Sequence, residues 1–319
     1  MRVPLPAAMM TIASSSVMRF SRGAIIGALC LAAVLALGGC STALRLVYDQ
    51  GPRLAWWWLD GYADFDDAQR APVHQAIDAW FEWDRRTQLP AYARLLERAS
   101  GEAARDTSAA PLCRLNHDAR RLALTAFEQA VPSIAEIAPT LSEAQLRHVE
   151  RRFAKRNAEF RDDYRLDDSL AEQQRAALKR TVERAEMLYG RLDDAQRERL
   201  ARGLAASPFD AALWLDERMA RQADILATLR RLRSEKLAPE QAQHAVRGVA
   251  ERIARSPRDG YRRYEAALTQ YNCALAAELH NGTTPEQRRH AVRRLEGWAG
   301  DLRALAAGPA PLPTRPAGP

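Results

Sequence analysis

The chain has 319 residues, of which 47% are apolar and 27% charged, with only 16 glycines and 17 prolines. This composition excludes collagen-like and low-complexity proteins, and the length is sufficient for a hydrophobic core without metals or disulfides. Three of the basic residues lie in residues 1–39, which contain no acid, so the rest of the chain carries 44 basic and 40 acidic residues. A net charge of +4 on that remainder is too small for a nucleic-acid-binding surface, and no nucleic-acid partner is expected.

The N-terminus has the pattern of an exported lipoprotein. Two arginines precede an apolar run over residues 23–35 that is short for a transmembrane helix. The run ends in Leu37-Gly38-Gly39-Cys40, which resembles the bacterial lipobox, where small residues precede a cysteine that receives a diacylglyceryl group. We therefore predict a signal peptide over residues 1–39 and a covalent lipid on Cys40, with no other cofactor. The alternative is an ordinary signal peptide with an incidental cysteine.

The residue after the cysteine predicts the destination. Ser41 follows Cys40, and by resemblance to lipoprotein sorting in Gram-negative bacteria, a residue other than aspartate favours the outer membrane. Two or more acyl chains make such an anchor stable. The expected localisation is therefore the outer membrane, with the protein body in the periplasm.

The body of the protein retains two cysteines, Cys113 and Cys273. A pair of thiols in an exported protein is most simply explained by a disulfide. Cys273 also lies off the helical stripe of apolar residues between Tyr261 and Leu279, which favours a partner on another element over simple burial. We predict a Cys113–Cys273 disulfide, with two unpaired structural thiols as the alternative.

Beyond the leader, helix-favouring residues dominate and no window alternates as a strand does. The predicted fold class is all-α, as a multi-helix bundle or an irregular helical array. We expect a lipidated tether over 40–52, a helical periplasmic domain over 53–307, a loop over 101–110 and a Pro-rich flexible tail over 308–319. Helices are predicted near residues 53–61, 67–88, 90–99, 112–130, 143–164, 169–189, 194–206, 209–234, 239–254, 258–280 and 285–306.

The first of these helices contains Trp56, Trp57 and Trp58. Three consecutive side chains cannot all face one core, because neighbours on a helix differ by about 100°. Exposed tryptophans would suit a membrane interface or a protein partner, so these residues are a candidate interface. The alternative is that the helix lies between two layers and is covered on both sides.

A short motif recurs at the predicted helix starts. A hydroxyl or carboxylate residue stands three positions before a glutamine, which is the pattern of a helix capping box. The residues concerned are Asp66 and Gln69, Ser142 and Gln145, Asp193 and Gln196, and Thr284 and Gln287. Leu237-Ala-Pro-Glu-Gln241 is a similar start, and residues 239–247 resemble residues 285–293 closely enough to indicate an internal helix-hairpin duplication.

No catalytic or metal-binding motif accompanies these starts. His148, His244 and His290 each stand three residues after a motif glutamine, so a shared metal would require three helix starts to converge. The sequence has no HExxH, no glycine-rich phosphate loop and no Gly-x-Ser-x-Gly. We therefore predict no metal site and no enzymatic activity.

Several of these residues resemble a known family. The lipobox, the tryptophans with Asp60-Gly-Tyr62, and the words Trp83-Asp-Arg-Arg and Gln88-Leu-Pro-Ala-Tyr92 are similar to bacterial envelope lipoproteins catalogued as domain of unknown function 6279. That resemblance supports the predicted localisation and the fold class, and it implies no catalytic residues. Leu141-Ser-Glu-Ala-Gln145 is also weakly similar to the Leu-Thr-x-x-Gln motif of Spy and CpxP periplasmic chaperones.

The function expected from these features is binding. A lipid-anchored helical protein without catalytic motifs would act as an envelope scaffold, a chaperone-like protein or an assembly factor, with the membrane and an envelope protein as partners. One alternative is an envelope hydrolase or transferase whose acid and base are distant in sequence. The other is a dispensable structural or stress lipoprotein.

Overall fold

The computed structural model describes Tyr48 and residues 50–308, and this part is helical without a β-strand, which confirms the all-α fold class. The predicted signal peptide, Cys40 and the tail beyond Gly308 lie outside the described residues. None of the described helices combines the length and apolar character that a bilayer crossing requires. The helices are α3 (Gly51–Ala63), α4 (Asp67–Trp83), the π-helix η1 (Asp84–Gln88), α5 (Leu89–Ala103), α6 (Ala109–Ile137), the 3₁₀ helix η2 (Ala138–Thr140), α7 (Glu143–Tyr164), α8 (Leu170–Tyr189), α9 (Asp194–Ala205), α10 (Ala211–Ser234), α11 (Pro239–Ala254), α12 (Asp259–Asn281) and α13 (Pro285–Ala306).

Most helix ends lie close to their predicted positions, and the main differences occur at prolines. No break separates α4 from α5, because η1 joins them as a π-turn and the chain stays helical through Pro90, the second residue of α5. α6 continues through Pro132, and the loop predicted over 101–110 shortens to 104–108. α3 begins at Gly51, two residues before the predicted helix start at 53, and most of the predicted tether lies outside the described residues.

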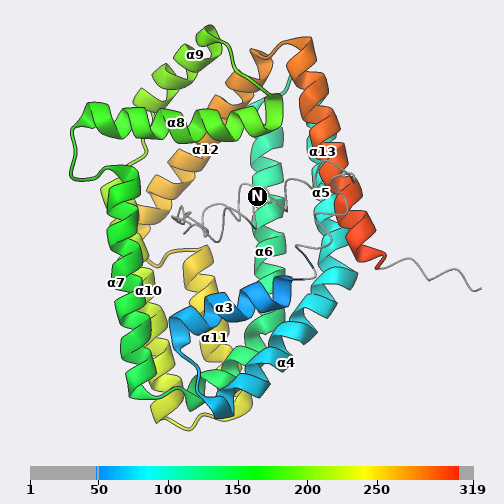
Figure 1. Cartoon of the computed structure of the whole chain (residues 1–319). Coiled ribbons are helices and arrows are strands. Elements are labelled where there is room, and N and C mark those ends of the chain that lie inside the picture. Colours follow the sequence, from blue (N-terminus) through cyan, green and yellow to red (C-terminus); the bar gives the residue numbers. More distant parts are fainter. Residues whose placement is uncertain (1–47, 49, 309–319) are drawn as a thin grey trace, which may run out of the picture.

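The helices are arranged around the long α6, which contacts α4, α5, α11 and α12 (Figure 1). α5 and α13 lie side by side along one edge, and α7 and α10 lie along the opposite edge (Figure 1). α8 crosses between these edges at one end and packs against α9 and α13. The result is an irregular array of paired helices.

The apolar core is divided among several clusters. Val131 of α6 and Val246 of α11 belong to one, which also includes residues of α10. Leu200 of α9 and Leu279 of α12 belong to another, and Leu295 of α13 packs with residues of α5. Because each cluster joins only two or three helices, the corners between them need other connections.

One such corner is closed by two capping glutamines at the starts of α4 and α7. The Gln69 Nε2 donates to the Gln145 Oε1 at 3.4 Å, and the Gln145 Nε2 donates to the Gln69 Oε1 at 2.7 Å. Each Oε1 also accepts the backbone N–H of its own N-cap residue, Asp66 or Ser142. Each Nε2 donates further to a carbonyl two residues before the other motif's N-cap, those of Thr140 and Asp64, at 3.0 and 2.8 Å.

The starts of α9 and α13 form a second closed corner with the same pattern. The Gln196 Nε2 donates to the Gln287 Oε1 at 2.7 Å, and the Gln287 Nε2 donates back at 2.9 Å. Their amides also reach the carbonyls two residues before the opposite N-caps, those of Gly282 and Arg191, at 3.1 and 2.9 Å. The caps Asp193 and Thr284 donate their N–H groups to the glutamine Oε1 atoms. In both corners every amide hydrogen of the glutamine pair has an acceptor.

A histidine completes each closed corner. The His148 Nε2 lies 3.3 Å from the carbonyl oxygen of Gly61, and the His290 Nδ1 lies 2.9 Å from that of Leu188. Each carbonyl stands five residues before the N-cap of the opposite motif and belongs to the last turn of a helix, where carbonyls lack helical partners. The capping residues therefore join helices as well as start them.

Candidate functional site

One face of α3 presents large apolar side chains to solvent. Leu54, Trp57 and Trp58 are 55%, 62% and 50% exposed. Their spacing of three and four residues places them on the same side of the helix. The helix contacts α4 and α7 elsewhere on its surface. The alternative that this helix is covered on both sides is therefore wrong.

Trp56 differs from its two neighbours because it packs against α4. Its ring stacks on His74 with 4.1 Å between ring centroids, and it also contacts Phe65. The Arg70 guanidinium lies 5.9 Å from its centroid. Of the predicted interface residues, the structure thus places one in a packed environment and leaves two exposed.

A pocket of about 360 Å³ lies beside the exposed tryptophans, between α3 and α7. The α3 side supplies aromatic and carboxylate groups, and the α7 side supplies basic ones. The lining residues are Trp57, Trp58, Asp60, Gly61, Asp64, His148, Arg152 and Arg156. This composition suits an apolar group at one end and an acidic group at the other.

The basic wall of this pocket is organised around Tyr62. The Arg152 guanidinium lies 5.5 Å from the Tyr62 ring centroid, and its buried Nε has no hydrogen-bond partner among the described residues. Arg156 donates from Nε to the Tyr62 hydroxyl at 3.3 Å and from Nη1 to Glu159 at 2.7 Å. The hydrogen bond to Glu159 raises the pKa of Arg156, so the guanidinium keeps its proton.

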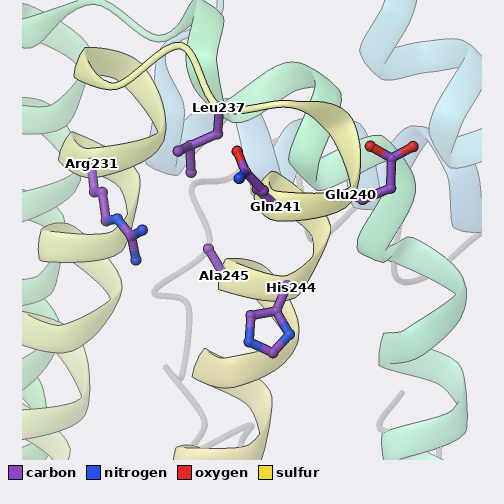
Figure 2. A pocket seen from close by; sticks show the side chains of 6 residues that line it. All are labelled: Arg231, Leu237, Glu240, Gln241, His244 and Ala245. Atoms are coloured by element: carbon purple, nitrogen blue, oxygen red, sulfur yellow. The ribbon is translucent and has the colours of Figure 1, made fainter.

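A second pocket, of about 310 Å³, lies where α11 begins and faces α10 (Figure 2). It is lined by Arg231, Leu237, Glu240, Gln241, His244 and Ala245. The Gln241 Oε1 accepts the N–H of Ala238 at 3.2 Å, as in the other capping boxes. Ala238 has no side-chain oxygen, and this start of a helix has no second motif against it within residues 50–308.

The π-helix η1 carries a buried carboxyl group. Asp84 is 4% exposed, and its Oδ2 accepts a hydrogen bond from the Tyr48 hydroxyl at 2.9 Å. Its Oδ1 has no partner in the described part of the chain, and the same is true of the buried Gln88 Oε1 and Tyr92 hydroxyl. A π-turn with unpartnered buried polar atoms is a frequent mark of a functional position.

Asp84 is the titrating group of this cluster. Burial raises the pKa of Asp84 to about 6, and the hydrogen bond from Tyr48 acts in the opposite direction. Burial and the nearby Asp84 carboxylate raise the pKa of Tyr92, so its hydroxyl keeps its proton. Arg85 stacks over Tyr48, at 4.9 Å from the ring centroid, and donates to the Leu305 carbonyl at 3.3 Å. The cluster therefore also connects η1 with the end of α13.

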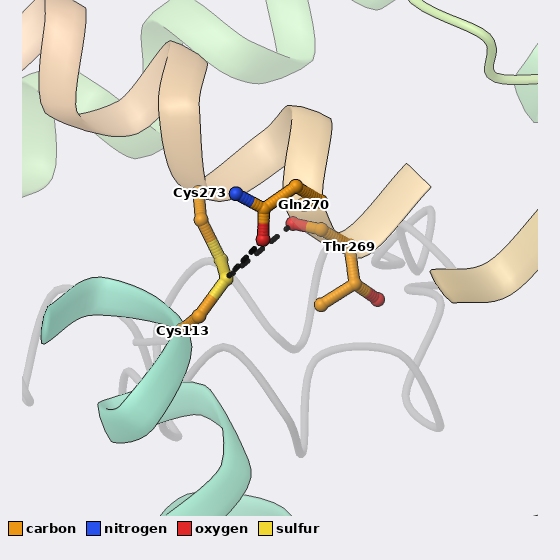
Figure 3. Close-up of a disulfide and its surroundings, with 4 residues drawn as sticks. All are labelled: Cys113, Thr269, Gln270 and Cys273. Carbon is orange, nitrogen blue, oxygen red and sulfur yellow. Dashed lines mark hydrogen bonds between the residues drawn. A yellow bond between two sulfur atoms is a disulfide. The ribbon is translucent and has the colours of Figure 1, made fainter. Parts of the chain in front are cut away.

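The structure brings the two predicted disulfide cysteines together. The sulfur atoms of Cys113 on α6 and Cys273 on α12 are 2.09 Å apart, with 5.6 Å between the Cα atoms (Figure 3). Cys273 is buried, although we expected it off the apolar stripe of its helix. The reason is that α12 packs against α6 and α9 and so buries more than one face.

The three histidines at helix starts lie in different surroundings. His148 and His290 contact carbonyls in the two closed corners, and His244 lines the pocket at α11. Within the described residues no group of three or more His, Cys, Asp or Glu side chains has the arrangement of a metal site.

Comparison with protein families adds an identification. The model of the family of unknown function DUF6279 matches residues 61–242, more than half of the chain. The chain belongs to this family. The resemblance predicted from the sequence is thereby confirmed, whereas the weaker one to Spy and CpxP remains a likeness in letters. No curated protein and no solved structure matches the chain.

The DUF6279 match includes some of these features and omits others. It begins at Gly61, so Leu54, Trp57 and Trp58 precede it. It includes the basic wall of the pocket between α3 and α7, the first closed corner, and the η1 cluster except for Tyr48 and Leu305, and it ends just after Gln241. The second closed corner lies partly outside it, because Gln287 follows the matched residues. Membership in this family assigns no activity.

Asp84, Gln88 and Tyr92 were not among the site residues predicted from the sequence. They belong to the short sequence segments on which the family resemblance rests. A π-turn has no sequence periodicity of its own from which it could have been predicted. The basic wall was also missed. His148, Arg152 and Arg156 recur every four residues on one face of α7, a spacing that could have identified it.

Proposed function

We propose that this DUF6279 protein is a lipid-anchored protein of the outer membrane that works in the periplasm by binding another envelope protein. It would serve as a scaffold, a chaperone-like protein or an assembly factor. One observation carries the proposal: the exposed Leu54, Trp57 and Trp58 adjoin a pocket with a basic wall. We call these residues and the pocket beside them the α3 surface.

The composition of the α3 surface favours a protein partner. Tryptophan, tyrosine and arginine are enriched at the energetic centres of protein interfaces. Covering the exposed part of each tryptophan would contribute on the order of 3 kcal/mol before the costs of association. Arg152 and Arg156 would pair with an acidic group, so the expected partner presents an apolar side chain next to a carboxylate.

The bilayer is a competing occupant of this surface. Leu54 follows the predicted lipidation site Cys40 by 14 residues, and such a segment reaches at most about 50 Å when extended. Tryptophan also suits the membrane interface. The two occupants differ in what would lie against Trp57.

Photocrosslinking in intact cells separates these occupants. A photoreactive amino acid at Trp57 should yield one discrete protein adduct, and the same group at Leu170, an equally exposed apolar position on α8, should not. The double variant R152E/R156E should remove the adduct, because it reverses the charge of the pocket wall. Adducts to lipid alone, or the same adducts from both positions, would overturn the proposed protein partner. The absence of any adduct would favour the dispensable structural role.

The anchor has its own test. Replacing the thiol in C40S should move the protein from the membrane fraction to the soluble fraction, because the hydroxyl cannot accept the diacylglyceryl group in thioether linkage. Mass analysis of the mature N-terminus should find acyl chains on Cys40. An unmodified residue 40, or unchanged membrane partitioning of C40S, would contradict the predicted lipid anchor.

A hydrolase or transferase is the second candidate, and the Asp84 cluster is the observation that favours it. A carboxyl group with a pKa of about 6 is suited to acid–base chemistry at neutral pH. Because Asp84 is buried, the Tyr48 segment would have to move to admit a substrate. Wild type that turns over envelope peptides or glycans, with D84N folded but inactive, would establish this function in place of binding.

A further inference from the structure

The two closed corners obey one pairing rule. In each, two capping glutamines exchange hydrogen bonds, and each amide also donates to the carbonyl two residues before the opposite N-cap. One motif of each pair adds a histidine three residues after its glutamine, which contacts the carbonyl five residues before the opposite N-cap. The rule holds at the same offsets in both corners, although the helices involved differ.

The start of α11 has the glutamine and the histidine that this rule requires, but neither contacts a second motif. Gln241 is exposed, and its Nε2 has no partner in the described part of the chain, whereas Gln69, Gln145 and Gln196 are buried. His244 follows at the required distance of three residues and is also exposed. Both side chains line the 310 Å³ pocket (Figure 2). In the closed corners a second motif fills the corresponding position.

The other four motifs of the chain are already paired with one another, so none is available to fill the position beside Gln241. We propose that the occupant is a second copy of this chain, whose α11 start pairs with this one around a two-fold axis. The glutamine hydrogen bonds of the closed corners are themselves reciprocal, because each amide donates to the other motif and accepts from it. Reciprocity of this kind is what an interface between two identical patches demands.

The rule also names the atoms of the contact. The Gln241 Nε2 would donate to the Gln241 Oε1 and to the Lys236 carbonyl of the second copy, because Lys236 stands two residues before the cap Ala238. His244 would reach the carbonyl of Arg233, five residues before that cap and in the last turn of α10. Each copy contributes the same residues, so the pairing closes on a dimer.

The variant Q241E provides a sharp test by light scattering on the purified full-length chain. Glutamate keeps the oxygen that accepts the Ala238 N–H but has no hydrogen to donate, and two such carboxylates would repel one another across the axis. Wild type should therefore have the mass of a dimer, and Q241E that of a monomer with unchanged helicity. Q174E, at an exposed glutamine of α8, is the matched control and should stay dimeric. A monomeric wild type, or a dimeric Q241E, would overturn the proposal.

Cysteine crosslinking tests the same contact in intact cells. Two differently tagged copies that both carry Q241C should give a reducible species of twice the mass that contains both tags. The same experiment with Q174C should give none. A Q241C adduct that contains one tag and a foreign protein would show that another chain occupies the pocket and would refute self-pairing. Neither the light-scattering nor the crosslinking experiment involves Trp57. Their outcomes are therefore independent of the function proposed for the α3 surface.

Discussion

The two closed corners and the start of α11 use the same sequence motif with different results. At Gln69 and Gln145 the motif is buried and joins α4 to α7, whereas at Gln241 it starts a helix and leaves an amide facing a pocket. The glutamine plays the same capping role at each start, because it accepts the N–H of its own N-cap, although Ala238 has no side-chain oxygen to accept a bond in return. What differs is the presence of a second motif. A capping box thus becomes a tertiary connection only where the fold brings two of them together.

The largest expected effect on stability concerns the disulfide between α6 and α12. α6 leads to the first closed corner and α12 leads to the second. If the Cys113–Cys273 disulfide forms, C113S should lower the free energy of unfolding by about 2–5 kcal/mol, since the bridge spans 160 residues of the unfolded chain. Urea denaturation with and without reductant measures this. Reductant should destabilise wild type and leave C113S unchanged; an equal effect on both would mean that the thiols are not bridged.

Removing one glutamine from a closed corner should cost nearly as much. Q145A deletes the hydrogen bonds to Ser142, Asp64 and Gln69 and leaves buried groups without partners, so we expect a loss of about 3 kcal/mol. Q241A deletes one exposed capping bond and should cost about 0.5 kcal/mol under monomeric conditions. Equal losses in urea titrations would contradict the distinction between closed and open corners.

These comparisons require a fixed pH, because Asp84 makes stability pH-dependent. Its pKa is raised to about 6 from an ordinary value of 3.8, so the folded state holds the proton more tightly than the unfolded state. The contribution of Asp84 is therefore most favourable below pH 4 and is lost as the pH rises through about 6, by on the order of 2 kcal/mol. D84N removes the titrating proton. The unfolding free energy of wild type should therefore fall relative to that of D84N between pH 4 and pH 7. A constant difference between the two proteins would refute the raised pKa.

The smallest effect separates the two kinds of histidine. H148A removes a contact with the Gly61 carbonyl in the first closed corner and should lower stability by about 1 kcal/mol. H244A removes a side chain with no partner in the described part of the chain and should leave the stability of the monomer within about 0.5 kcal/mol of wild type. Thermal unfolding of the two variants at one pH provides the measurement. A larger loss for H244A than for H148A would reverse the comparison.

Much of the fold could be predicted because its determinants are local. Asp66, Ser142, Asp193 and Thr284 mark helix starts by chemistry within four residues, and the structure begins a helix directly after each. The helix through Pro132 and the absence of a break at Pro90 were missed, because packing and the π-turn compensate for what those prolines remove. The candidate site could be predicted only in part. Neighbouring positions on a helix differ by about 100°, which indicated that the tryptophans must separate but not which of them would be exposed.

Residue type and short spacing were enough to predict the helical class, the positions of the capping boxes and the pair of cysteines in the body of the chain. The packing of the helices, by contrast, establishes that Gln69 meets Gln145, that Gln196 meets Gln287 and that Gln241 meets none of the other four motifs. The same packing buries Asp84 and leaves its Oδ1 without a partner among the described residues. Hydrogen bonds between groups 70 or more residues apart depend on how whole helices pack, and no local pattern encodes that packing.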